Sequence, residues 1–233
     1  MTSAKLKTIA IISMTIDHLA GTILWKKLCP VLIQFLSTIG LQISQTHLYL
    51  AFRSVGRIAF PIFAFLIVEG CRHTKDPKKY LIRLFLFACI SELPFDYAIY
   101  GRINILNQNV FFTLFLGACM IMCFEKSGCS DLLQIAFHAS IFVLFAIIAT
   151  ILHTDYSYIG IGMIAIFYFF AMMKPAYYVM AFFQSFRWYY ILPLGLSISL
   201  ILLYNGQRGK QFKWFFYAFY PFHLLLFYIS GTI

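Results

Sequence analysis

Two ionisable residues stand side by side in the first apolar stretch of the chain, Asp17 and His18 in MTIDHLA. A charged side chain at the centre of a membrane span costs roughly 2.5 to 3.5 kcal/mol on insertion scales, so such residues tend to be paired inside a bundle and functional. A neutral histidine is less costly to bury than an ion and accepts a proton near neutral pH, which an arginine does not. His18 is therefore the leading candidate for a general base.

Two further pairs of charged residues have a spacing of four along apolar segments, Arg53 with Arg57 and Glu92 with Asp96. Residues four apart lie on one face of a helix, so two positive and two negative groups can meet at matching depth and neutralise each other. Two interpretations are open: ion pairs that hold helices together, and a polar site.

Two prolines near these charged residues remove hydrogen bonds from the helical backbone. Pro61 cannot donate a hydrogen bond to the carbonyl of Arg57, and Pro94 leaves the carbonyl of Ile90 without its helical donor. Freed carbonyls suit a polar cavity. His223, in YPFHLLL, is a further candidate, for which helix packing and a place in the site are both open.

A cluster of basic residues follows the second apolar segment, in the run CRHTKDPKKYLIR. Its members are Arg72, His73, Lys75, Lys78, Lys79 and Arg83. Such clustering is expected of a cytoplasmic loop, because lysine and arginine are in excess on that side of a membrane. It also fits an anion site for the phosphates of a cytosolic nucleotide-like donor.

The composition is that of an integral membrane protein, with 62% hydrophobic and 11% charged residues, against about a quarter charged in soluble domains. This predicts a single membrane domain over residues 1–233. The net charge of +10 is assigned to loops beside the spans, not to nucleic-acid binding. Lys5 and Lys7 precede an apolar run without a cleavage-like site, so the first span is expected to be retained. The six cysteines show no disulfide framework and no metal spacing.

The apolar windows predict an all-α fold, a polytopic membrane helical bundle of about nine transmembrane helices, roughly eight to ten. The windows cover approximately residues 8–24, 48–70, 80–99, 108–124, 132–152, 158–173, 176–186, 189–204 and 212–229. The seventh is short, and its existence as a span is open. Residues 30–45 are apolar but interrupted, which indicates an interfacial or re-entrant segment on the outer face.

The distribution of basic residues sets the expected orientation. With nine spans and a cytoplasmic N-terminus, twelve basic residues lie inside and four outside. Those inside are Lys5, Lys7, Arg72, Lys75, Lys78, Lys79, Arg83, Lys126, Lys174, Arg208, Lys210 and Lys213, and those outside are Lys26, Lys27, Arg102 and Arg187. The bias predicts a multi-pass protein of the cell (inner) membrane with its N-terminus in the cytoplasm and its C-terminus outside.

Several sequence blocks carry a family resemblance. They are the dipeptide DH in the first span, RSVGRIAFPIFAFLIVEGCRHT, KKYLIRLFLFACISELPFD, NVFFTL and FYAFYPFHLLL. Nearly end to end, the chain resembles the TraX family of membrane proteins, with GRIAFPIFAF and SELPFD as the most specific blocks. The best-known activity of that family is N-terminal acetylation of conjugative pilin, so the resemblance implies an acetyltransferase.

A broader similarity concerns Lys7 and His18, which have ten residues between them. The spacing resembles the opening of membrane acyltransferases that move acyl groups from cytosolic acyl-CoA to outward acceptors, where an arginine stands in place of the lysine. The ammonium group of lysine does not form the bidentate hydrogen bonds that the guanidinium group of arginine forms with phosphate. The similarity therefore bears on His18 more firmly than on Lys7.

These resemblances imply acetyl-CoA as the acyl donor, with a membrane acyltransferase-like bundle around it. Eleven residues of helix span about 16 Å, so Lys7 would lie at the cytoplasmic mouth and His18 deep in the bundle, joined by the pantetheine arm. The residues implied in holding the phosphates are Lys7, Arg72, Lys75, Lys78 and Lys79.

The implied catalytic group consists of His18 as general base, Glu92 or Asp17 as an associated acid, and Arg57 at the thioester carbonyl or its oxyanion. Because helix neighbours point in different directions, Glu92 is favoured over Asp17 as the partner of His18. Arg53, Asp96 and His223 are the implied substrate-binding residues. No metal is expected.

Several alternatives are open at this stage. The acceptor is a pilin N-terminal amine or another protein, or a glycan or lipid hydroxyl for an O-acetyltransferase. A proton-coupled transporter would also need buried acids and histidines in broken helices, although no internal repeat relates the two halves. The expected partners are acyl-CoA, the acceptor and membrane lipids. Whether the acetyl group is transferred directly or through an acetyl-histidine intermediate is open. The oligomeric state is open as well.

Overall fold

The computed structural model describes residues 1–125, 131–170, 191–210 and 213–232. The predicted seventh span at 176–186, together with Lys126, Lys174 and Arg187, lies outside these residues. Within them the chain is all-α, and the single β-type contact is an isolated bridge between Gln108 and Thr154. The all-α prediction is confirmed.

The helices agree with most of the predicted windows. They are α1 Ser3–Gly21, α2 Trp25–Thr38, α3 Gln45–Gly56, α4 Ala59–His73, α5 Pro77–Tyr100, α6 Val110–Phe124, α7 Asp131–Ile151, α8 Ser157–Phe170, α10 Ile191–Leu202 and α11 Lys213–Thr232. Several of them are apolar, as in a helical membrane bundle.

Two stretches of the described chain are long and apolar enough to cross a bilayer by themselves, Gln45–His73 and Leu132–Ile151. Helices α1 and α2 qualify only when taken together, across a bend of 97°. Helices α6, α8 and α10 contribute shorter apolar segments. The expected number of about nine crossings stays a prediction.

The predicted second span, the window at 48–70, lies within the apolar stretch Gln45–His73, which a short break divides into α3 and α4. Helix α3 ends at Gly56, Arg57 follows as its C-terminal cap, and α4 begins at Ala59. The physical reason is Pro61, which has no N–H to offer the carbonyl of Arg57. Arg57 therefore lies at the break between α3 and α4.

The segment expected at the membrane interface is helical. Helix α2 turns away from α1 by 97° and buries Trp25 and Cys29 against Ala20 and Leu48. Its opposite side leaves Val31, Phe35 and Ile39 more than half exposed. These three residues are four apart, so they form one apolar stripe, the pattern of a helix that lies in an interface.

The chain forms two compact units, of which the first comprises residues 1–62, 93–104 and 187–233. In this unit α1 and α3 are antiparallel, because Ser13 donates to the carbonyl of Val55 at 2.6 Å and Asp17 pairs with Arg53. The two helices cross closely at Gly56, where an added Cβ would lie 2.1 Å from the Cβ of Asp17.

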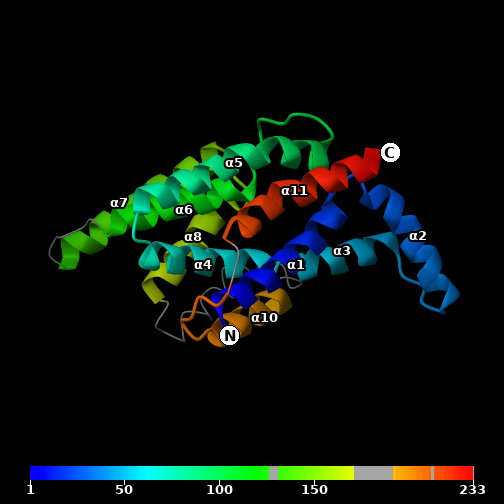
Figure 1. Ribbon diagram of the computed structural model, residues 1–233, viewed down its shortest axis with the longest axis horizontal. Coiled ribbons are helices and arrows are strands. Elements are labelled where there is room, and N and C mark those ends of the chain that lie inside the picture. The colour runs from blue at the N-terminus through cyan, green and yellow to red at the C-terminus, as the bar shows by residue number, and fades with distance from the viewer. Residues whose placement is uncertain (126–130, 171–190, 211–212, 233) are drawn as a thin grey trace. The chain divides into compact units, whose positions relative to one another are not determined.

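Helices α1 and α11 run side by side in the same direction in the first unit (Figure 1). The ammonium of Lys7 lies over the ring of Phe216, and further along His18 meets His223. At the start of α1, the N–H of Ser3 donates to the carbonyl of Gln207 at 2.9 Å. The beginnings of α1 and α11 and the end of α10 therefore share one end of the unit.

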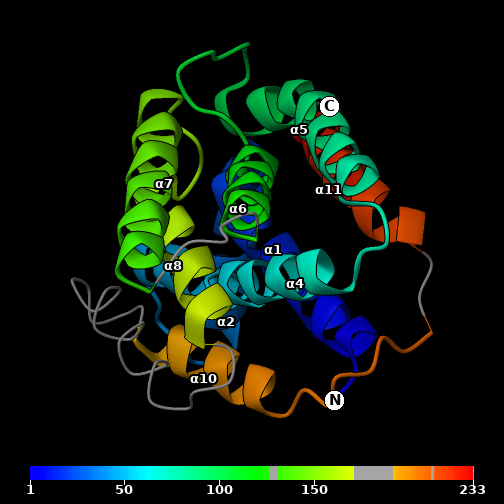
Figure 2. The ribbon, with the colours of Figure 1, turned by 90° about the vertical axis from the view of Figure 1, so that its left-hand side faces the viewer.

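The second unit comprises residues 63–92 and 105–186. Helices α6, α7 and α8 pack against one another in it (Figure 2). Gly117 lets α6 and α8 approach, since an added Cβ would lie 2.3 Å from a methyl carbon of Ile164. Helices α4 and α5 contain the boundaries between the two units. A single domain over the whole chain stays a prediction.

Candidate functional site

Two buried histidines meet where α1 and α11 pack together. Helix α1 leaves 9% of His18 exposed, and α11 leaves 3% of His223 exposed. The Nδ1 atom of His18 lies 2.7 Å from Nε2 of His223, and the two rings are nearly parallel, with 12° between their planes. We call these two residues the histidine pair.

Aromatic rings enclose the histidine pair on the α11 side. Phe219 stacks on His223 with 5.1 Å between ring centroids, and Phe227 contacts it edge-on at 5.6 Å. Tyr220 lies edge-on to His18 at 5.5 Å. The spacing of four between Phe219, His223 and Phe227 places all three on one face of α11. The pair is therefore packed against aromatic rings of α11.

Asp17 and His18 contact different helices despite being neighbours. Asp17 Oδ2 forms an ion pair with Nη1 of Arg53 on α3 at 2.8 Å, with 13% and 26% of the two side chains exposed. Arg57 also attracts the Asp17 carboxylate electrostatically. The partner seen for Arg53 is thus an acid of the first helix, where the sequence had pointed to Glu92 and Asp96.

The two predicted acids of α5 accept hydrogen bonds from amide groups. Glu92 accepts from the backbone N–H of Asn109 at 3.1 Å and also from the side-chain amide of that residue. Asp96, only 2% exposed, accepts from the N–H of Asn104 at 2.9 Å. Both acids therefore help to hold the segment between α5 and α6. His18, whose expected partner was Glu92, meets His223 instead.

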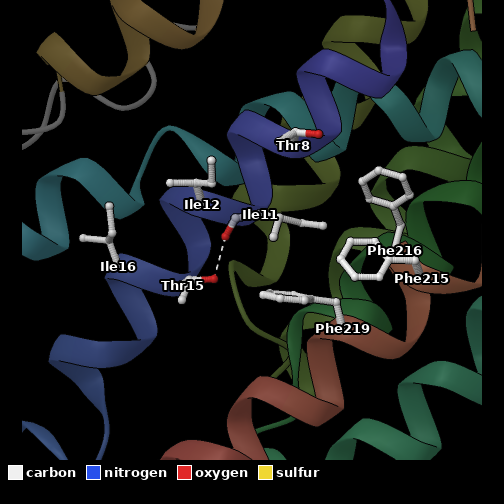
Figure 3. A pocket seen from close by; sticks show the side chains of 8 residues that line it. All are labelled: Thr8, Ile11, Ile12, Thr15, Ile16, Phe215, Phe216 and Phe219. Carbon is white, nitrogen blue, oxygen red and sulfur yellow. Dashed lines mark hydrogen bonds between the residues drawn. The ribbon is translucent and has the colours of Figure 1, made fainter. Parts of the chain in front are cut away.

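An apolar groove of about 420 Å³ runs between α1 and α11 (Figure 3). Its lining residues are Thr8, Ile11, Ile12, Thr15, Ile16, Phe215, Phe216 and Phe219. The two threonine hydroxyls donate to backbone carbonyls, Thr8 to Ala4 at 3.0 Å and Thr15 to Ile11 at 2.8 Å. The groove consequently presents methyl groups and aromatic rings, which suit a flexible, largely apolar chain.

The groove has a cation near one end and the histidine pair near the other. The Lys7 ammonium lies 5.5 Å from the ring centroid of Phe216, a lining residue. Phe219, another lining residue, stacks on His223. Along α1, Lys7 immediately precedes the first lining residue, and His18 follows the last by two positions.

In the second unit, the basic loop is partly engaged with protein groups. Arg72 donates to the carbonyl of Tyr168 at 2.8 Å, and the Lys79 ammonium lies 3.0 Å from Asp76 Oδ2. Hydrogen bonds from the backbone N–H of Lys79 and then from its ammonium hold the pKa of Asp76 below the ordinary value for aspartate. Lys75 and Lys78 are exposed. These two are the loop cations best placed for a phosphate from solution.

Comparisons with known proteins support the resemblance seen in the sequence. The model of a family described as TraX protein matches residues 2–230. The chain belongs to the TraX family. It is also similar to a Dichelobacter nodosus protein named probable fimbrial assembly protein FimC, serogroup H1, with 28% identity over 250 residues that cover 95% of this chain and 92% of that protein. No solved structure matches the chain.

As a TraX family member with apolar helices, this chain is a membrane protein. Its sequence revealed His18 and His223 as separate candidates, but not that they form a pair, because they are 205 positions apart in the chain. The groove was also missed. The one available signal was the spacing of four between Phe219 and His223 in FYPFH, which places an aromatic ring directly over the histidine.

The histidine pair and the groove can together perform acid–base chemistry on a long ligand. A histidine inside an apolar bundle can take and return one proton, and the groove can hold an extended chain beside it. Among the described residues, no group of three or more histidine, cysteine, aspartate or glutamate side chains could hold a metal ion.

Proposed function

We propose that this TraX family member is a membrane-embedded acetyltransferase, which moves an acetyl group from cytosolic acetyl-CoA to an acceptor at the outer side of the membrane. The favoured acceptor is the N-terminal amine of a pilin. The family assignment supports this acceptor, and so does the relative from Dichelobacter nodosus, whose name is that of a probable fimbrial assembly protein.

The observation that carries the proposal is the order of groups along the seam of α1 and α11: a cation, an apolar groove, and a buried histidine. Acetyl-CoA has a matching order, with anionic phosphates at one end, a long flexible arm, and the reactive thioester at the other end. Lys7 and His18 are eleven residues apart, a distance of about 16 Å along a helix. The arm can therefore reach from the phosphate end to the histidine.

In the proposed reaction, the acceptor amine attacks the thioester carbonyl while Nε2 of His18 takes a proton from the amine nitrogen. The new C–N bond forms as the C–S bond breaks, and the imidazolium of His18 returns the proton to the departing thiolate. The products are the acetylated amine and CoA with a free thiol, and His18 is neutral again. Such a positioned base typically contributes a factor of about 10² to 10⁴.

The surrounding charges complete this mechanism. Arg57, at the break between α3 and α4, is assigned to stabilise the oxyanion that develops on the carbonyl oxygen. Lys7, at the start of the groove, is assigned to the donor phosphates. An α-amino group has a pKa of about 7.7 to 8.0, so a fraction of it is already the neutral amine near pH 7 and can attack the thioester.

The test is acetyl transfer by purified protein in lipid nanodiscs, with radiolabelled acetyl-CoA and a synthetic peptide that carries a pilin N-terminus. We expect wild-type protein to acetylate the peptide amine. His18→Ala should lower the rate per folded molecule by roughly a hundredfold or more while acetyl-CoA binding survives. Donor binding with full activity in His18→Ala would contradict the proposed mechanism.

Two other outcomes identify the competing functions. Label found on a glycan or lipid hydroxyl, with the peptide unmodified, would make the chain an O-acetyltransferase and overturn the choice of acceptor. A wild-type protein that binds no acetyl-CoA would contradict the donor and favour a proton-coupled transporter. Mass spectrometry of pilin from cells with and without the gene checks the acceptor independently.

A further inference from the structure

We propose that His223 is the positioning residue of His18: it fixes which nitrogen of His18 carries a proton and shares the positive charge that forms during transfer. This inference rests on the acetyltransferase function proposed above. It assigns a role to a residue that the sequence offered only as a substrate contact. The histidine pair would then act as one unit.

The hydrogen bonds of the pair determine the proton positions. Nδ1 of His223 lies 2.9 Å from the carbonyl oxygen of Phe219, and a carbonyl only accepts, so this nitrogen carries a hydrogen. In a neutral imidazole the other nitrogen, Nε2, then presents a lone pair. Nδ1 of His18 must therefore be the donor across the 2.7 Å contact with that Nε2. Neutral His18 is left with its lone pair on Nε2.

This order of donors makes Nε2 of His18 the proton acceptor in the reaction. The chain runs from His18 Nδ1–H to His223 Nε2, and from His223 Nδ1–H to the Phe219 carbonyl. Both links are made to groups on one face of α11. Without His223, Nδ1 of His18 would lose its hydrogen-bond acceptor. No contact with His223 would then favour the Nδ1–H tautomer of His18 over the Nε2–H tautomer.

A neutral partner also suits a base that works in an apolar site. A carboxylate beside His18 would favour the imidazolium form before substrate arrives, since an opposite charge stabilises it. His223 leaves His18 neutral until Nε2 takes the proton from the acceptor. The contact to His223 then becomes charge-assisted and shorter, which spreads the positive charge over two rings. When the thiolate recovers the proton, the pair returns to its starting state.

Phe219 connects this pair to the groove. Its carbonyl accepts from His223, its ring stacks on His223, and it lines the groove. A donor arm in the groove therefore contacts the residue that orients His223. Phe219 therefore couples the orientation of the histidine pair to the occupancy of the groove.

The first experiment compares two substitutions of His223 by acetyl transfer per folded molecule. His223→Leu removes the acceptor for Nδ1–H of His18 and should lower kcat by about tenfold or more, as loss of the orienting member of a triad does. His223→Gln supplies an amide oxygen that can accept this hydrogen bond, and should restore part of the rate. KM for acetyl-CoA should change less than kcat in both variants.

Two controls separate positioning from general damage. His138→Gln changes another membrane histidine, one that bonds the carbonyl of Phe124 at 3.3 Å, and should keep near wild-type activity. The double variant His18→Ala/His223→Leu should be no slower than His18→Ala alone, because residues that act as a unit show non-additive losses.

The second experiment reads the tautomer directly by ¹⁵N NMR of full-length protein labelled at histidine. In wild type we expect His18 to carry its proton on Nδ1, and in His223→Leu to shift toward the Nε2–H form. This readout does not depend on activity. It also applies to a variant that folds but has lost transfer for another reason.

The outcomes distinguish this inference from the function on which it rests. His223→Leu with wild-type kcat, or an unchanged His18 tautomer in that variant, overturns the positioning role while the acetyltransferase stands if His18→Ala is inactive. Full activity of His18→Ala overturns both. Partial rescue by His223→Gln together with the tautomer shift supports the pair as one unit.

Discussion

Adjacent residues of a helix point about 100° apart, and this simple geometry organises the candidate site. Asp17 turns to Arg53 on α3, while His18 turns to His223 on α11. One dipeptide thereby connects α1 to two different helices by two different interactions. The ion pair is suited to structure, whereas two neutral imidazoles in contact, each with one donor and one acceptor nitrogen, are suited to proton transfer.

The ion pair leads to a prediction about stability at the residue scale. Arg53→Ala leaves the Asp17 carboxylate without its partner, and should lower the free energy of unfolding by about 3 kcal/mol, the low end for buried pairs, because 26% of the Arg53 side chain stays exposed. Thermal unfolding in detergent, followed by near-UV circular dichroism, measures the loss. The yield of folded protein should fall as well.

A paired substitution serves as the control for Arg53. Asp17→Asn/Arg53→Gln removes both charges and keeps groups that can hydrogen bond, so most of the stability should return. The same loss in Arg53→Ala and in the double variant would show that the charge pair contributes little. The arginine would then act through its packing against Gly21, where a Cβ added to the glycine would lie 3.3 Å from Nη1 of Arg53.

At the scale of the helices, the sequence predicted well which segments are helical. Apolar runs and helix-breaking residues such as proline act locally, so they can be recognised without knowing the fold. Helix α6 begins at Val110, one residue after Asn109, whose side chain caps the N–H of Phe111 at 3.0 Å. Pro61 marked the opened backbone next to Arg57, but the pattern of apolar residues continues across it. Pro61 therefore indicates where the helix breaks, whereas the apolar window at 48–70 shows only that the stretch is one candidate span.

The close crossing of α1 and α3 gives the second prediction. Gly56→Ala places a methyl group 2.1 Å from the Cβ of Asp17, so the helices must separate. Overpacking of this kind costs about 1 to 3 kcal/mol. Separation also strains the hydrogen bond from Ser13 to Val55 at 2.6 Å. Unfolding temperature and acetyl transfer should both fall.

A second glycine provides a matched control for Gly56. Gly195 lies in α10, where none of the other described residues comes within 4 Å of an added Cβ, so Gly195→Ala should leave stability unchanged or raise it by about 0.5 to 1 kcal/mol through helix propensity. Equal unfolding temperatures for the two alanine variants would contradict the close crossing.

The third prediction concerns the groove between α1 and α11. Thr8→Trp fills the groove near Lys7 and leaves the histidine pair unaltered, so acetyl-CoA affinity should fall while kcat at saturating donor is retained. Leu196→Trp adds the same ring at a position of α10 that is 48% exposed, and should leave affinity unchanged. Isothermal titration with acetyl-CoA measures both. Equal affinities would place the donor elsewhere.

For the whole molecule, the sequence predicted what depends on composition and missed what depends on long-range pairing. Membrane character, helical content and His18 as a candidate follow from residue types. The contact of His18 with His223 and of Arg53 with Asp17 depends on which helices pack together. Several acids had the charge to pair with Arg53, and no local pattern selects among them.

The last prediction tests the topology, and it separates packing from orientation. In the first unit, Ala4 N–H donates to the carbonyl of Arg208 at 3.1 Å, so Lys5 and Arg208 share one end. At the other end, the N–H of Ile23 donates to the carbonyl of Ala98 at 3.2 Å, close to Arg102.

Single cysteines at Lys5 and Arg208 should label alike with an impermeant maleimide, as should those at Lys26 and Arg102, because each pair shares an end. Which pair reacts in intact cells depends on orientation, and the excess of inner lysine and arginine predicts Lys26 and Arg102. Labelling of Lys5 and Arg208 instead would invert the orientation and place the groove's cation on the side without acetyl-CoA, whereas a mixed result within a pair would contradict the packing of the unit itself.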